Sequence, residues 1–155
     1  MADLDALDTA ILTALQTNAR MSNREVAARV GVSPTTALDR TRALRRRGVI
    51  LGASLDVDLA QVGRAVQALI SVRVRPPSRD VIEAFRDWVS LLPETLGVFV
   101  VSGDVDFIIH VAVADNEALY AFVIDRLTER EEIADVRTTV VYEHLRNPVG
   151  ISPTR

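Results

Sequence analysis

The chain has 155 residues, enough for one ordinary domain or two small ones. Apolar residues make up 48% and charged residues 25%, which is the composition of a folded globular protein rather than a disordered one. The lack of cysteine excludes disulfides, iron–sulfur clusters and thiolate zinc sites, and there is no apolar run of about 18 residues. We therefore expect a cytoplasmic protein that does not enter the membrane.

The charges are unevenly distributed. All 18 basic residues are arginine, for which codon bias is the simplest explanation. Between Arg20 and Arg47 eight arginines stand against two carboxylates, whereas from Ala53 onward ten arginines stand against sixteen. A basic first third joined to an acidic remainder is typical of a protein whose first domain binds a polyanion.

The first third of the chain predicts three helices. A cap formed by Asp5 and Asp8 precedes apolar residues at helical spacing, and Ser22 to Glu25 is a capping box that begins a second helix. Gly31 fits the end of that helix, and Ser33 followed by Pro34 begins a third helix that runs to about Arg47. Two short helices joined by a turn that contains glycine indicate a helix-turn-helix.

The segment after Gly48 predicts a wing. Residues 49–57 have the pattern of an extended hairpin, so residues 1–57 are expected to form a winged helix-turn-helix domain. Residues 58–64, which include Gly63, are the expected hinge.

The remainder predicts a sandwich of a sheet and two helices. Apolar residues alternate in a strand from Val66 to Arg75, a helix follows from Asp80 to Pro93, and strands cover residues 97–102 and 107–113. A second helix begins near Asp115, and residues 136–143 form the last strand. The order βαββαβ predicts an α+β fold with a ferredoxin-like domain over residues 65–146, both helices on one sheet face, and a loose tail at 147–155.

The sheet face without helices is expected to be an interface. Strand alternation places Leu69, Val101, Ile108 and Ala112 on that face, which makes it too apolar for a monomer in water. The alternative is that these are scattered exposed apolar residues of the ordinary kind. We predict a homodimer.

The sequence contains no convincing catalytic constellation. There is no glycine-rich phosphate loop, nucleophile elbow or His-Glu-x-x-His motif, and His110 and His144 lack partners at metal-ligand spacing. His110 fits a hydrogen-bonded interface residue better than a catalytic base. We therefore expect no catalytic residue, no metal and no cofactor.

The third helix is the strongest functional signal. Its N-terminal hydroxyls and its outward side chains are suited to phosphates and base edges of double-stranded DNA. The expected DNA contacts are Arg24, Ser33, Thr35, Thr36, Asp39, Arg40, Arg42 and Arg46. The alternative is a helical scaffold that binds proteins, as degenerate winged helices do.

Both domains, in order, resemble the Lrp/AsnC family of feast/famine transcriptional regulators. The residues that carry the resemblance are Leu4-Asp5-Ala6-Leu7-Asp8, Ile11-Leu12, Ala19-Arg20, Glu25-Val26-Ala27, Val32-Ser33-Pro34, Arg40, Leu44, Gly48-Val49-Ile50 and Gly103-Asp104-Val105-Asp106-Phe107. The resemblance implies a DNA-binding regulator whose dimers assemble into larger rings such as octamers. An enzyme similar to siroheme decarboxylases, which look like this family, is the alternative.

The resemblance also implies a site for a small amino acid or related metabolite between dimers. That site lies near Gly103, Asp104, Val105 and Asp106 and near Thr138 and Thr139 of the last strand. In this interpretation Asp106 accepts a hydrogen bond from the ligand's ammonium, while loop amides and threonine hydroxyls donate to its carboxylate. The alternative is that this loop is only a good hairpin turn, with Asp106 bonded to the backbone.

Overall fold

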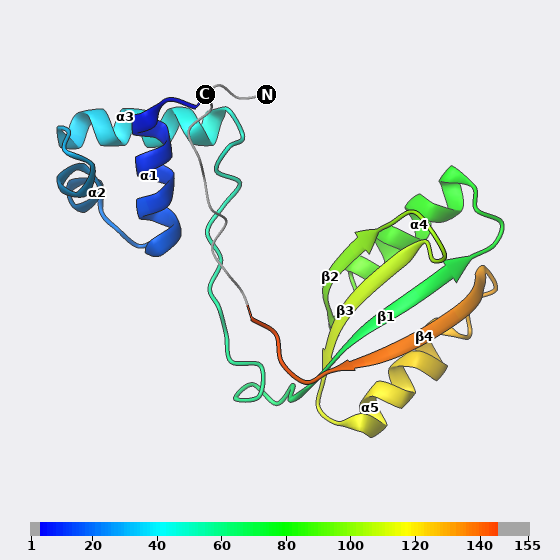
Figure 1. Ribbon diagram of the computed structural model, residues 1–155. Coiled ribbons are helices and arrows are strands. Elements are labelled where there is room, and N and C mark those ends of the chain that lie inside the picture. Colours follow the sequence, from blue (N-terminus) through cyan, green and yellow to red (C-terminus); the bar gives the residue numbers. More distant parts are fainter. Residues whose placement is uncertain (1–3, 146–155) are drawn as a thin grey trace. The chain divides into compact units, whose positions relative to one another are not determined.

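The computed structural model describes residues 4–145 and divides the chain into two compact units (Figure 1). Residues 4–55 form a helical unit, together with Leu145, and Asp56–His144 form an α+β unit. The predicted tail at 147–155 lies outside the described residues.

The helical unit has the three predicted helices: α1 (Ala6–Thr17), α2 (Asn23–Val30) and α3 (Pro34–Arg46). Each predicted cap is present. The Asp5 side chain accepts from the Asp8 N–H, Ser22 and Glu25 form the reciprocal capping box, and Gly31 ends α2 in the left-handed conformation at φ 75°. Local polar groups thus begin and end these helices, and the apolar faces pack into one small core.

A buried carboxylate joins the first helix to the third. The Asp8 side chain is only 3% exposed, and it lies 3.2 Å from Nη1 of both Arg40 and Arg47. Arg40 also lies 2.6 Å from Asp5 Oδ2. Because a buried carboxylate is costly without partners, the two arginines fix where α3 crosses the start of α1.

The predicted wing is wrong. Residues 48–65 contain turns and extended backbone but no strand, and Leu51 and Leu55 are 94% and 80% exposed. A two-stranded hairpin is marginal in water unless its apolar side chains pack against something. Here Val49 and Ile50 pack on the helical core, but Leu51 and Leu55 remain exposed. The alternating pattern was therefore not enough to form strands.

The α+β unit contains one antiparallel sheet of four strands in the order β2-β3-β1-β4 (Figure 1). The strands are β1 (Val66–Val74), β2 (Thr95–Val100), β3 (Phe107–Val113) and β4 (Ile133–Val141). The helices are α4 (Arg79–Ser90) and α5 (Asn116–Ala121), in the predicted βαββαβ order.

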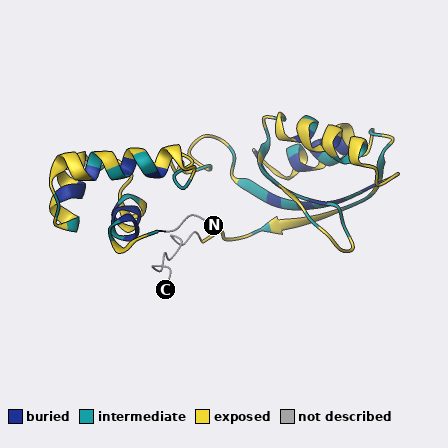
Figure 2. Ribbon diagram, turned by 90° about the horizontal axis from the view of Figure 1, so that it is seen from above, coloured by how far each residue is buried: buried dark blue, intermediate teal, exposed yellow. Residues whose placement is uncertain are grey.

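Both helices cover the same sheet face, as predicted (Figure 2). Every second residue of β1, from Ala68 to Val74, is fully buried against them. Phe85 of α4 packs on Phe107 of β3 with ring centroids 4.7 Å apart. The sheet alternation and the helical stripe therefore meet in one apolar core.

The second helix of this unit differs from a plain α-helix. After Ala121 the chain continues as a π-helical segment, η1 (Phe122–Leu127), in which Phe122 and Leu127 are buried. The apolar pattern predicted a helix through Leu127 but carried no sign of the wider winding. π-helical segments are rare and occur often at functional sites.

The sheet face without helices carries apolar side chains among polar ones, and not all the predicted residues contribute to it. The strand register places Phe99, Ile108 and Leu69 there, and a hydrogen bond of 3.0 Å joins His110 Nε2 to Gln67 Oε1 on the same face. Val101 lies beyond the end of β2, and Ala112 is already buried within the chain. Val101 was wrong because the strand ends earlier than expected, whereas Ala112 points to the open face as predicted, opposite Gln67, but is only 1% exposed.

We predict that Asp8→Ala lowers the free energy of unfolding of the helical unit by about 1–3 kcal/mol, because it removes the acceptor shared by Arg40 and Arg47. Hydrogen exchange of the α1 and α3 amides measures this locally. Asp39→Ala, an exposed carboxylate on α3, is the matched control and should change stability by about 0.5 kcal/mol or less. Equal exchange in the two variants would contradict a structural role for Asp8.

Candidate functional site

The outward face of α3 is exposed and carries most of the predicted DNA contacts. Thr35, Thr36, Asp39, Arg42 and Arg46 are all exposed, as is Arg24 on α2. Ser33 is the N-cap of α3: its hydroxyl accepts from the Thr36 N–H at 3.1 Å and lies 2.8 Å from the Thr36 hydroxyl. The helix therefore presents a capped, positively polarised N-terminus followed by two exposed guanidinium groups.

Arg40 has a different environment from the other predicted contacts. Its guanidinium is directed to Asp5 and Asp8, so part of its hydrogen-bonding capacity is used inside the unit. The Asp8 backbone N–H and then the Arg40 guanidinium hold the pKa of the Asp5 carboxyl below its ordinary value of 3.8. Asp5 in turn raises the pKa of Arg40. Sequence alone could not separate Arg40 from Arg42 and Arg46, because the partner carboxylates lie more than 30 residues away.

The loop from Gly103 to Asp106 joins β2 to β3 and is tied to β1. The Asp106 N–H donates to the Val72 carbonyl at 2.9 Å, and the Val74 N–H donates to Asp106 Oδ2 at 2.8 Å. Arg73 donates from Nε to the Asp104 carbonyl at 2.9 Å. Gly103 has a φ of 130°, where a side chain would be strained. One Asp106 oxygen thus has a backbone partner within the subunit.

The structure does not bring Thr138 and Thr139 together with this loop. Thr138 pairs with Ile70 and Thr139 with Leu69, so the two side chains point to opposite faces of β4. Strand β1 lies between β4 and β3, which the loop precedes. Within one subunit, only Thr139 shares the open sheet face, and it does so two strands away from the loop.

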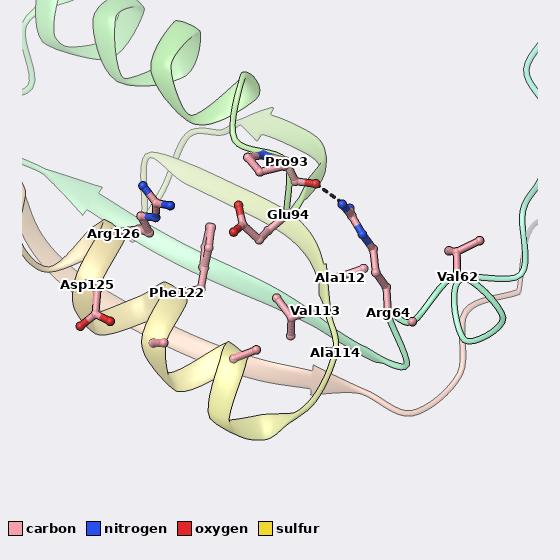
Figure 3. A pocket seen from close by; sticks show the side chains of 13 residues that line it. Val62, Arg64, Pro93, Glu94, Ala112, Val113, Ala114, Phe122, Asp125 and Arg126 are labelled. Carbon is pink, nitrogen blue, oxygen red and sulfur yellow. Dashed lines mark hydrogen bonds between the residues drawn. The ribbon is translucent and has the colours of Figure 1, made fainter.

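A pocket that the sequence analysis missed lies at the other end of β3 (Figure 3). It encloses about 500 Å³ between the segment Val62–Arg64, the start of β2, the end of β3 and the α5–η1 helix. Its charged lining residues are Arg64, Glu94, Asp125 and Arg126. No sequence motif could have found them, because they come from three separate segments that only the fold assembles.

Residues 4–145 contain no cluster of three or more His, Asp or Glu side chains able to hold a metal ion. None of the helices in this range has the length and apolar character needed to cross a membrane.

Family models match both units of the chain. Residues 4–45 match the AsnC-type helix-turn-helix domain, and residues 67–149 match the Lrp/AsnC ligand binding domain.

Several relatives and solved structures are similar over nearly the whole chain. The transcriptional regulator AldR of Mycolicibacterium smegmatis is 40% identical over 97% of this chain and 86% of its own length. The leucine-responsive regulatory protein of Escherichia coli is 33% identical over 93% of this chain and 88% of its own length. The structure of a Neisseria meningitidis transcriptional regulator in complex with L-Met has a TM-score of 0.87 at 29% identity, covering 96% of each chain. The fold, the two matched domains and these relatives together show that the chain belongs to the Lrp/AsnC family of DNA-binding transcriptional regulators.

Proposed function

We propose that this regulator contacts double-stranded DNA through the exposed face of α3 and that a small amino acid or related metabolite controls the binding. The observation that carries the proposal is the exposed row of Thr35, Thr36, Arg42 and Arg46 on a capped helix in a strongly basic unit. The curated relatives are regulators, which favours this function over the enzyme alternative. We place the protein in the cytoplasm, with residues 1–57 as the DNA-binding domain, 58–64 as the hinge and 65–146 as the sensing domain.

Dimerisation through the open sheet face is the second part of the proposal. Phe99 is 58% exposed there, opposite Ile108 and on the same face as Leu69, so a partner on this face would remove these apolar side chains from water. A two-fold dimer also presents two recognition helices to one duplex, as pseudo-palindromic operators require. Larger rings, such as an octamer of four dimers, are part of the same proposal.

The effector is proposed to bind at the loop of Gly103–Asp106, including Asp104 and Val105. Asp106 Oδ1 has no partner among the described residues and could accept from an ammonium group, while Oδ2 remains on the Val74 N–H. Because Thr138 and Thr139 lie away from this loop in one subunit, their participation requires residues from a second copy. The regulator similar to this chain that was solved with L-Met supports an amino acid as the class of effector.

The double variant Arg42→Ala/Arg46→Ala should weaken binding to every DNA sequence and flatten the slope of log affinity against log salt by about one unit for each arginine. Fluorescence anisotropy over a range of salt concentrations measures this. Arg79→Ala/Arg86→Ala on α4 removes the same charge from exposed positions in the other unit and should leave the slope nearly unchanged. An α3 variant that binds as tightly as wild type at every salt concentration would show that the DNA face is elsewhere.

The variant Ile108→Arg should shift the protein from dimer or larger assembly toward monomer, because a charge would be buried at the interface without a partner. Light scattering reports the mass, and circular dichroism shows whether the fold is kept. Ile124→Arg, at a partly exposed position on η1, is the matched control and should leave the mass unchanged. A wild-type protein that is monomeric at micromolar concentration would refute the proposed interface.

An amino acid that changes the DNA affinity of the wild type should leave that of Asp106→Asn unchanged. The asparagine oxygen can still accept from the Val74 N–H, so the variant removes the charge while it keeps the loop anchored. The measurement is operator binding with and without each common amino acid. An equal response in variant and wild type would place the effector site away from this loop.

A further inference from the structure

The pocket at the carboxyl end of β3 is separate from the loop at its start. Six residue steps of strand, at about 3.4 Å each, put roughly 20 Å between them. Its volume of about 500 Å³ lies within the range of about 300–1,000 Å³ usual for small-molecule sites. The pocket belongs wholly to the α+β unit.

The floor of the pocket is apolar. Ala112 and Val113 come from β3, Ala118 and Ala121 from α5, and Phe122 from η1. Val113 and Phe122 are nearly fully buried, and both belong to the core on the helix side of the sheet. Such a floor can accept an aliphatic group of a few carbons.

The walls of the pocket carry acidic and basic side chains that form no ion pair with one another. Glu94 Oε2 is buried and has no hydrogen-bond partner among the described residues, and Glu94 makes no ion pair with Arg64 or Arg126. Arg126 also makes no ion pair within residues 4–145. Arg64 donates one hydrogen bond, from Nη1 to the Pro93 carbonyl at 2.5 Å, which leaves its other N–H groups available. In the view of Figure 3, Glu94 lies between the two arginines.

A buried carboxylate oxygen without a partner is costly and rare in native proteins. Its cost is removed when a ligand cation occupies the space beside it. The guanidinium groups would be satisfied by an anionic group on the same ligand. Because the four charged lining residues have no net charge, a ligand with one positive and one negative group leaves the pocket neutral. The walls therefore fit a ligand that is itself both cationic and anionic.

The helix geometry is a second, independent observation. The π-helical segment η1 supplies Phe122, Asp125 and Arg126 to the pocket. A π-turn holds more residues than an α-turn, so it changes the direction of the side chains that follow it. Such segments are uncommon and are found most often where a helix contributes to a site.

We propose that this pocket binds a small zwitterion, an amino acid with an aliphatic side chain. Glu94 accepts from the ammonium, Arg126 and Arg64 donate to the carboxylate, and the side chain lies on Val113 and Phe122. The proposal goes beyond the effector site at Gly103–Asp106 and does not depend on it.

A single introduced cysteine reports on this pocket directly, because the chain has no cysteine of its own. Ala114→Cys places a thiol at an exposed position of the lining, and Ser90→Cys on α4 is the control. The probes are L-alanine, L-valine, L-leucine and L-methionine, with isobutylamine and isovalerate as the valine analogues that lack one charge. A ligand at about ten times its Kd should slow maleimide labelling of Cys at 114 about tenfold and leave Cys at 90 unaffected.

Three variants in the Ala114→Cys background separate this site from the loop. Glu94→Gln and Arg126→Gln should each raise the Kd obtained from the protection by about 10-fold to 100-fold, the effect of one lost charge-assisted hydrogen bond. Asp106→Asn should leave the protection unchanged. Melting curves confirm that each variant is folded, and Glu83→Gln is the charge-matched control on α4.

The possible results distinguish binding in the pocket from binding at the loop. Protection that depends on Glu94 and Arg126, persists in Asp106→Asn and needs both charges of the ligand supports the pocket. The proposal is overturned if none of the four amino acids protects the thiol, if both pocket variants keep full protection, or if a valine analogue protects as well as valine. Loss of the DNA response in Asp106→Asn without any protection at residue 114 would leave the loop site standing and the pocket refuted.

Discussion

Strand β1 is the constraint on which the α+β unit depends. It pairs with β3 on one side and β4 on the other, and its buried positions meet both helices. A shift of one residue would move every buried side chain to the open face, so the register is strongly determined. The same strand anchors the loop through Val72 and Val74, and Arg64, just before it, reaches the pocket. Both candidate ligand sites are therefore placed by one strand.

The helical unit uses part of its positive charge to hold itself together. Asp8 lies beneath Arg40 and Arg47, and Arg40 also contacts Asp5, so these cations help to set the angle between α1 and α3. Arg42 and Arg46 remain exposed on the same helix. The local excess of arginine is thus divided between internal ion pairs and a surface that can meet phosphate groups. A count of charges cannot show this division.

Elements determined by neighbouring residues were predictable from the sequence. The caps at Asp5, Ser22 and Ser33 and the alternation in β1 appear where expected, since each depends on residues a few positions apart. The wing failed because a hairpin needs packing that the local pattern does not supply. The role of Arg40, the separation of Thr138 and Thr139 from the loop at Gly103–Asp106 and the pocket around Glu94 depend on contacts between distant segments. The π-helical turn of η1 left no mark in the apolar pattern.

The exposed cations of α3 are all arginines, and this restricts how the cell can adjust their charge. Acetylation neutralises a lysine amine, but arginine methylation keeps the charge and only blocks some of the hydrogen bonds. The positive charge of this helix is accordingly the same at any physiological pH and beyond the reach of acetyltransferases. In the proposed dimer, the relative positions of two such helices are then what can change the affinity for DNA.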